Sequence, residues 1–84
     1  YDQAIRDFTL CHQSVPNDPD VLNNRGVCHL RLGHLESALE DFNQAIALND
    51  QNPSYYINRA IVYRKMGRLA EARRDEKMRG EKTN

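Results

Sequence analysis

Apolar residues recur at helical spacing through the middle of the chain. Between residues 35 and 48 they fall close to an i, i+3, i+4, i+7 pattern, which gathers them on one face of a helix. These apolar positions are Leu35, Ala38, Leu39, Phe42, Ala45, Ile46 and Leu48. A second apolar stretch covers residues 21–32. Gly33 lies between the two, where a helix end needs a residue that tolerates positive φ. The pattern predicts two helices joined by a tight turn.

The same pattern returns in register, with residue i matching residue i+34. Asp18-Pro19 and Asn52-Pro53 each supply a helix N-cap and a first-turn proline, one period apart. Further positions match at the same offset: Ala4 with Ala38 and Ala72, Asp7 with Asp41 and Asp75, Phe8 with Phe42, Asn24 with Asn58, Arg25 with Arg59, Gly33 with Gly67, and Leu35 with Leu69. We therefore expect five helices and no strand, with the helices over residues 1–15, 19–32, 35–49, 53–66 and 69–79.

This register resembles the tetratricopeptide repeat family, whose repeats have the same length. The matches in the first full period are Leu22, Gly26, Gly33, Leu35, Ala38, Phe42, Ala45 and Leu48; those in the second are Tyr56, Ala60, Tyr63, Gly67, Leu69 and Ala72. The departures are Arg25, His29, Asp50, Glu76 and Arg79. The resemblance implies an all-α fold, a short right-handed solenoid of stacked helix pairs. Residues 1–18 would be the second helix of a partial repeat, 19–52 a complete repeat, and 53–84 a repeat with a divergent, charged last helix.

Small residues in this register predict close helix crossings. Gly26 and Ala38 are expected where the two helices of one repeat cross, and Phe42 is expected to fill the space between repeats. The apolar stripe of the last helix weakens after Ala72, so its outer side is expected to face water.

Composition narrows the class of protein further. The 84 residues allow one small domain, and 39% hydrophobic residues without Trp give a thin core rather than a deep enclosed site. No apolar run is long enough for a membrane span, and the first residue is Tyr1, which suggests a piece of a longer chain. Two cysteines argue against a disulfide framework and favour an intracellular, cytoplasmic location.

The net charge of zero hides an asymmetry. Residues 1–52 carry three basic and eight acidic groups, a net charge of −5, whereas residues 53–84 carry nine basic and four acidic groups, a net charge of +5. The sequence indicates either a dipolar module or solvated faces that differ in sign.

Catalytic and metal-binding patterns are missing from the sequence. Cys28 and His29 are adjacent, so they point about 100° apart on a helix and do not suit one tetrahedral metal. Cys11 occupies a small-residue core position. The serines fall at helix ends, the glycines are too scattered for a phosphate loop, and the pairs Glu40-Asp41 and Asp75-Glu76 are read as solvated faces. We predict no enzymatic activity, no metal and no cofactor.

Nucleic-acid binding is also not expected. The basic second half contains Tyr55, Tyr56 and Tyr63, and aromatic residues among basic groups can stack on bases. Tyr56 and Tyr63 fall on core positions of the repeat, however, and the chain as a whole is neutral.

The resemblance implies a peptide-binding groove on the first helix of each repeat. The positions taken as groove residues are Asn23, Asn24, Val27, Arg31, Ile57, Asn58, Ile61, Arg64 and Lys65. They form an apolar strip with amides, and the three cations fall at the last turn of their helices, which favours acidic and apolar peptides. Asn58 also resembles the asparagine of a carboxylate clamp, but the other clamp positions are not filled in this chain.

We therefore predict a non-catalytic module for protein–protein interaction that binds a short partner segment in this groove. The alternative is a structural spacer or self-association unit in a longer repeat protein. Ala4, Ile5, Phe8 and Cys11 favour it, because helix 1–15 has no preceding helix to cover its apolar side.

Overall fold

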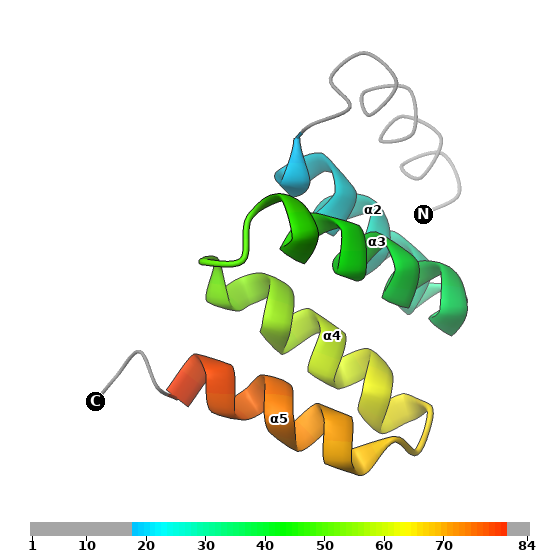
Figure 1. The fold of residues 1–84 in the computed structure, drawn as a ribbon. Coiled ribbons are helices and arrows are strands. Elements are labelled where there is room, and N and C mark those ends of the chain that lie inside the picture. The colour runs from blue at the N-terminus through cyan, green and yellow to red at the C-terminus, as the bar shows by residue number, and fades with distance from the viewer. Residues whose placement is uncertain (1–17, 81–84) are drawn as a thin grey trace.

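The computed structural model describes residues 18–80, which form four α-helices and no strand (Figure 1). The helices are α2 (Pro19–Arg31), α3 (Leu35–Leu48), α4 (Pro53–Lys65) and α5 (Leu69–Gly80). The all-α prediction is confirmed, and these four helices match the expected ones to within one residue at each end. The expected helix 1–15, with Cys11, lies outside the described residues.

The helix ends follow the capping residues seen in the sequence. Asp18 Oδ1 accepts hydrogen bonds from the backbone N–H groups of Asp20 and Val21, at 2.9 and 3.4 Å. One period later, Asn52 Oδ1 accepts from the N–H of Ser54 at 2.9 Å. The turns inside the two helix pairs contain Gly33 and the equivalent glycine of the second repeat, with φ of 82° and 81°, which L side chains rarely adopt.

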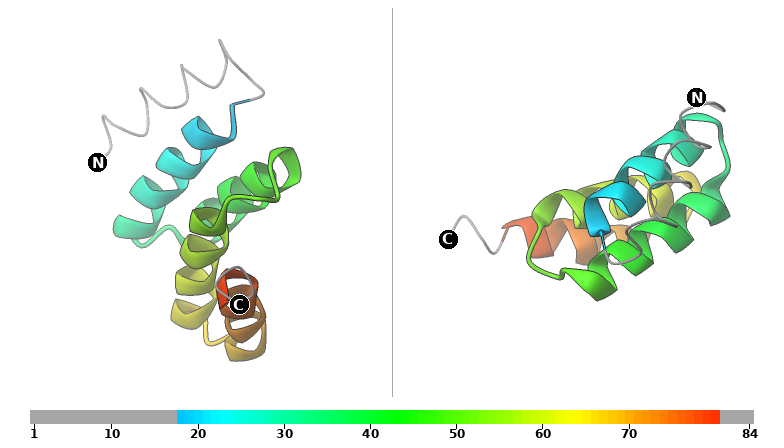
Figure 2. Two further views of the ribbon diagram at one scale, coloured as in Figure 1. Left: turned by 90° about the vertical axis from the view of Figure 1, so that its left-hand side faces the viewer. Right: turned by 90° about the horizontal axis from the view of Figure 1, so that it is seen from above.

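The four helices zigzag between two layers (Figure 2). Seen along the helices, α2 and α4 lie in one layer and α3 and α5 in the other. Each helix packs against the next in the chain: α2 on α3, α3 on α4 and α4 on α5. The arrangement is two stacked helix hairpins.

Phe42 is the centre of the core between the hairpins. It is fully buried together with Ala38 and Val62. Half-buried apolar residues from α2, from α3 and from the residue that follows α4 surround this cluster: Val27, Leu30, Leu35, Leu39 and Met66. A Cβ atom added at Gly26 would lie only 2.6 Å from Phe42 Cε1. The expected roles of Gly26 and Ala38 at a close crossing, and of Phe42 between repeats, are confirmed.

Two buried aspartates correct the sequence interpretation. Asp41 and Asp75 were expected on solvated faces, but they are only 3% and 2% exposed. Asp41 accepts from Arg25 Nε and Nη2 at 2.9 and 2.7 Å, and Asp75 accepts from Arg59 Nε and Nη2 at 2.8 and 2.7 Å. Each pair joins the two helices of one hairpin, so a bidentate, largely desolvated ion pair repeats with the fold.

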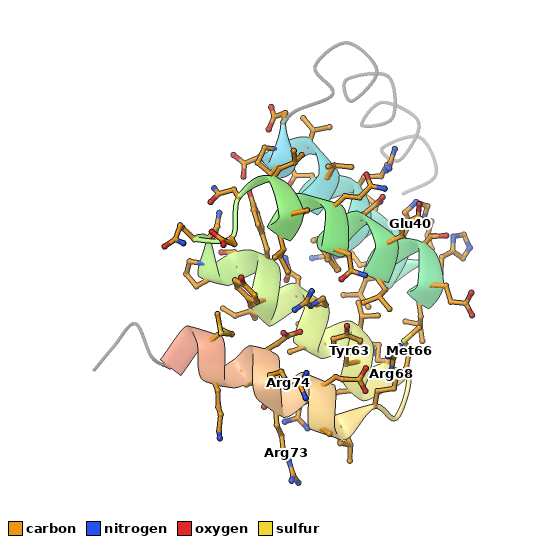
Figure 3. All side chains as sticks on the ribbon, in the orientation of Figure 1. Glu40, Tyr63, Met66, Arg68, Arg73 and Arg74 are labelled. Atoms are coloured by element: carbon orange, nitrogen blue, oxygen red, sulfur yellow. The ribbon has the colours of Figure 1, made fainter. Side chains whose placement is uncertain are left out.

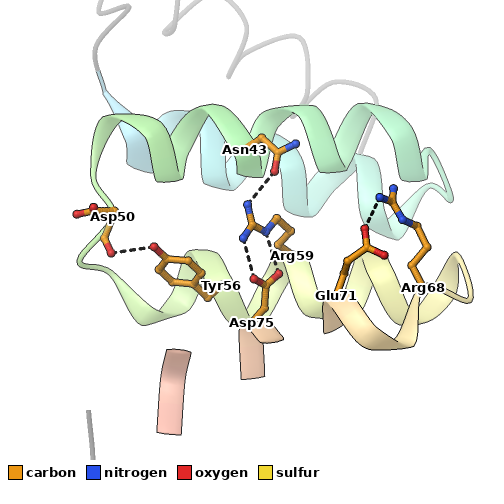
Figure 4. A network of polar contacts seen from close by, with 7 residues as sticks. All are labelled: Asn43, Asp50, Tyr56, Arg59, Arg68, Glu71 and Asp75. Atoms are coloured by element: carbon orange, nitrogen blue, oxygen red, sulfur yellow. Dashed lines mark hydrogen bonds and ion pairs between the residues drawn. The ribbon is translucent and has the colours of Figure 1, made fainter. Parts of the chain in front are cut away.

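Arg59 extends this pairing to a third helix (Figure 4). Its Nη1 donates to Asn43 Oδ1 on α3 at 3.0 Å, so one guanidinium joins α3, α4 and α5. The guanidinium carbon also lies 5.6 and 5.7 Å from the ring centres of Tyr56 and Tyr63. The hydrogen bonds to Asp75 raise the pKa of Arg59, which keeps its charge permanent.

The outer side of α5 carries few buried residues. Ala72 and Asp75 are buried toward α4, whereas Leu69 is 47% and Met78 36% exposed. Glu76 occupies the position that Phe42 holds one repeat earlier, and it accepts from Arg64 of α4. The prediction that this side of the last helix faces water is confirmed for the described residues.

Candidate peptide-binding groove

All nine predicted groove residues lie on α2 and α4, the two helices of one layer (Figure 2). The helices are neighbours in this layer although the whole of α3 separates them in sequence. The side chains of the set range from half-buried to exposed. The sequence therefore places these residues on one helix layer, and the contacts described below show which of them meet.

Two polar contacts join α2 to α4 across this layer. Asn58 Nδ2 donates to Asn23 Oδ1 at 2.9 Å, and the Tyr55 hydroxyl donates to Asp20 Oδ1. Burial, followed by the hydrogen bond to Asp20, raises the pKa of Tyr55 to about 12. Both contacts join residues 35 positions apart, one more than the repeat length. The Tyr55–Asp20 contact is therefore not apparent from positions that match at the repeat length of 34.

The hydrogen bond between Asn23 and Asn58 does not use all the donors and acceptors of these two side-chain amides on α2 and α4. An asparagine side chain has two donor hydrogens and one acceptor oxygen. The contact at Asn58 uses one donor hydrogen of that residue and one lone pair of Asn23. The side chain of Asn24 is exposed and makes no hydrogen bond with the described residues. Both the donors and the acceptors that a peptide main chain needs are therefore present on α2 and α4.

The apolar positions of the set divide between core and surface. Val27 packs against the cluster around Phe42, as does Leu30, the neighbour that shares its face of α2. Ile57 is half-buried, and Ile61 is 39% exposed. Within the expected apolar strip, the residues of α4 therefore offer more exposed surface to a ligand than Val27 of α2 does. Val27 contributes partly to the core.

The cations at the ends of α2 and α4 differ in their surroundings. Arg64 donates from Nε and Nη2 to the carboxylate of Glu76, both at 2.7 Å, and this raises the pKa of Arg64. Lys65 is exposed and makes no ion pair with the described residues, and Arg31 is exposed at the end of α2. The pairing with α5 is a feature that the sequence analysis did not predict for Arg64.

His29 lies beside the ion pair of the first hairpin. Its Nε2 lies 3.8 Å from Asp41 Oδ2, and its ring centre lies 5.7 Å from that of His34. Nδ1 is buried without a hydrogen-bond partner. Burial lowers the pKa of His29, which favours the neutral imidazole.

The described residues contain no group of three or more His, Cys, Asp or Glu side chains placed to hold a metal ion. Cys28 is a buried free thiol on α2. Among the helices that the structure describes, none combines the length and the apolar character needed to cross a membrane.

The paired helices and their repeating register define a helical-repeat protein. Two family models described as "Tetratricopeptide repeat" match the chain, one over residues 19–52 and the other over 42–74. The chain belongs to the tetratricopeptide repeat family. Such repeats form modules for protein–protein interaction and are generally non-catalytic.

Curated proteins of several kinds are similar to this chain. Photosystem I assembly protein Ycf3 of Rippkaea orientalis is 41% identical over 81 residues, covering 90% of this chain and 47% of the relative. U-box domain-containing protein 70 of Oryza sativa is 37% identical over 67 residues, covering 80% of this chain and 8% of the relative. Human small glutamine-rich tetratricopeptide repeat-containing protein beta is 35% identical over 65 residues, covering 74% and 21%. The chain spans less than half the length of each.

Solved structures show the same arrangement of helices. The first tetratricopeptide repeat domain of Spaghetti (RPAP3), bound to the HSP90 peptide SRMEEVD, has a TM-score of 0.94 and 31% identity, over 96% of this chain and 64% of that one. A structure of MamA (AMB-1) has a TM-score of 0.90 and 27% identity, over 96% of this chain and 44% of that one.

Proposed function

We propose that this chain is a non-catalytic module that binds a short, extended segment of a partner protein along the layer of α2 and α4. The observation that carries the proposal is the amide arrangement on this layer. Asn58 and Asn23 form a cross-helix pair at 2.9 Å, with Asn24 exposed beside it. Amide side chains suit a peptide main chain, since they donate and accept at the same time.

The preference for particular peptide side chains is expected to come from apolar and basic residues of α4. Ile57 and Ile61 offer apolar surface on α4, and Lys65 adds an exposed positive charge one turn later. Arg64 uses Nε and Nη2 for Glu76, so its Nη1 donors remain for a ligand. Acidic and apolar peptides are therefore favoured. The Spaghetti domain supports this preference, because the peptide bound to it, SRMEEVD, is acidic toward its end.

The binding is expected to be weak and sensitive to salt. Two hairpins offer a small surface, so we expect dissociation constants of about 10⁻⁶ M or weaker. Exposed charges contribute steering and specificity more than affinity, and the peptide should dissociate more readily as the ionic strength rises. Because this chain spans less than half the length of its relatives, a peptide-bearing protein as the partner of the whole protein is also part of this proposal. So does an intracellular, cytoplasmic location, which the buried free thiol of Cys28 favours.

The test is fluorescence anisotropy with an array of labelled peptides that differ in acidic and apolar content. Lys65→Glu should weaken the binding of acidic peptides selectively, and Asn24→Ala should weaken the binding of peptides of every composition. Lys77→Glu is the matched control, because it makes the same change of charge on an exposed lysine of α5. Equal binding by Lys65→Glu and Lys77→Glu, or no preference for acidic peptides, would contradict the proposal and favour the spacer function.

A further inference from the structure

A basic stripe runs along the outer face of α5. Ala70, Arg73, Arg74 and Lys77 follow i, i+3, i+4, i+7 spacing, so they share one face of the helix, and together they line a shallow hollow. Arg73, Arg74 and Lys77 are exposed, and none of their side chains forms an ion pair or hydrogen bond with the described residues. Figure 3 shows Arg73 extending away from the helices.

This face differs in kind from its counterpart on α3. In α3, Leu39 packs against the buried cluster that joins Phe42 of α3 to Val62 of α4. One repeat later, Arg73 stands at the position of Leu39, and Glu76 stands at the position of Phe42. The α5 face therefore lacks the apolar side chains with which α3 holds the next helix. Its chemistry suits a carboxylate-bearing surface instead.

Such a surface is present on α3 of the same chain. Glu36 and Glu40 are one helical turn apart, both are exposed, and neither forms an ion pair with the described residues. Their spacing matches that of Arg73 with Lys77, about 6 Å along the axis of a helix. The acidic stripe belongs to the half of the chain with a net charge of −5, and the basic stripe to the half with +5.

We propose that the basic stripe of α5 docks against the acidic stripe of α3 in a second copy of this chain. The contact is heterologous, since the two copies use different faces, and repetition would join copies head to tail. Charge complementarity within a neutral chain favours a second copy over an unrelated acidic protein. The contact does not involve α2 and α4, so it leaves the proposed peptide groove accessible.

The strength of such a contact is limited by solvent. Exposed ion pairs contribute little individually and are screened within about 10 Å at 0.1 M salt. Association is therefore expected only at high protein concentration and low ionic strength. Association that grows with salt would instead indicate apolar contacts and would overturn the proposal.

Sedimentation velocity on the 84-residue chain, across concentration and salt, tests the contact. We expect Lys77→Glu to weaken self-association about tenfold, whereas Lys65→Glu, with the same change of net charge, leaves it unchanged. Arg74→Glu/Lys77→Glu and Glu36→Lys/Glu40→Lys should each be monomeric, and an equimolar mixture of the two should associate again. Circular dichroism confirms that each variant is folded. A monomer under every condition, an equal loss with Lys65→Glu, or a mixture that stays monomeric would overturn the proposal.

Discussion

Replacing Gly26 by alanine should destabilise the protein, although alanine is the better helix former. In a helix interior, alanine is favoured over glycine by about 1 kcal/mol. The new Cβ atom, however, would lie 2.6 Å from Phe42 Cε1 and 2.9 Å from Cδ1 and Cζ. These separations are about 1 Å shorter than the best contact between carbon atoms. The ring is fully buried against Ala38 and Val62, so it has no free space to move into.

The size of the effect follows from these two opposing contributions. Overpacking a well-filled core costs roughly 1–3 kcal/mol, and the short contact with an immobile ring places Gly26→Ala near the upper value. After the gain in helix propensity is subtracted, the free energy of unfolding should fall by about 1–2 kcal/mol. Urea denaturation followed by circular dichroism should show a lower midpoint with an unchanged m-value.

The second repeat supplies a matched control. Ala60 occupies the position equivalent to Gly26, and there Glu76 stands where Phe42 stands in the first repeat. Ala60→Gly should therefore lower the free energy of unfolding by about 1 kcal/mol. The preference between glycine and alanine is then opposite at the two equivalent positions. Gly26→Ala combined with Phe42→Leu should recover part of the loss. A Gly26→Ala variant more stable than the parent would refute the close-crossing account.

Further substitutions and a change of pH should affect stability in stated ways. Phe42→Ala should lower the free energy of unfolding by about 3–5 kcal/mol by leaving a cavity, and Ala38→Leu by about 1–3 kcal/mol by overpacking; denaturant midpoints equal to the parent's would show that the core is misplaced. Asp75→Ala should cost about 2–4 kcal/mol, because it leaves the guanidinium of Arg59 without its carboxylate, and the Asp75→Ala/Arg59→Met variant should recover part of this cost. Burial lowers the folded-state pKa of His29, so its contribution to stability is present above pH 6.5 and is lost as the pH falls below it. Thermal melts from pH 7.5 to 5 should show a smaller decrease for His29→Tyr than for the parent, and an equal decrease would contradict the assignment.

The helices were predictable because their signals are local. The capping residues and the turn glycines each act within one or two turns of helix, the repeat register places them in both hairpins, and the described helix ends agree with them. The close approach of Gly26 to Phe42 was predictable for the same reason, because the repeat fixes which small residue faces which large one.

The ion pairs between helices were not predictable from charge pattern alone. Asp41 and Asp75 each have an acidic neighbour on an amphipathic helix, which suggests solvent exposure. Their burial depends on an arginine 16 residues earlier, on the other helix of the hairpin. The recurrence of the same spacing in both repeats is a signal that would have revealed these pairs.

The candidate groove was predictable as a set of positions but not as a set of contacts. The register places Asn23 and Asn58 on the first helices of their repeats, but their hydrogen bond depends on how the two hairpins stack. The pairing of Arg64 is a contact within the second hairpin, and its carboxylate partner lies 12 residues later on α5. Both contacts follow from how helices pack against one another, within a hairpin for Arg64 and between hairpins for Asn58, and no pattern local to one helix specifies that packing.

The central claim is that α2 and α4 together bind an acidic, apolar peptide. The most direct measurement is an NMR titration of the ¹⁵N-labelled chain with such a peptide, observing backbone amides and the side-chain amides of Asn23, Asn24 and Asn58. The account predicts saturable shifts of these amides and of the amides of Ile61 and Lys65, which diminish as salt is added. A titration without shifts, or with shifts confined to α3 and α5, would contradict it.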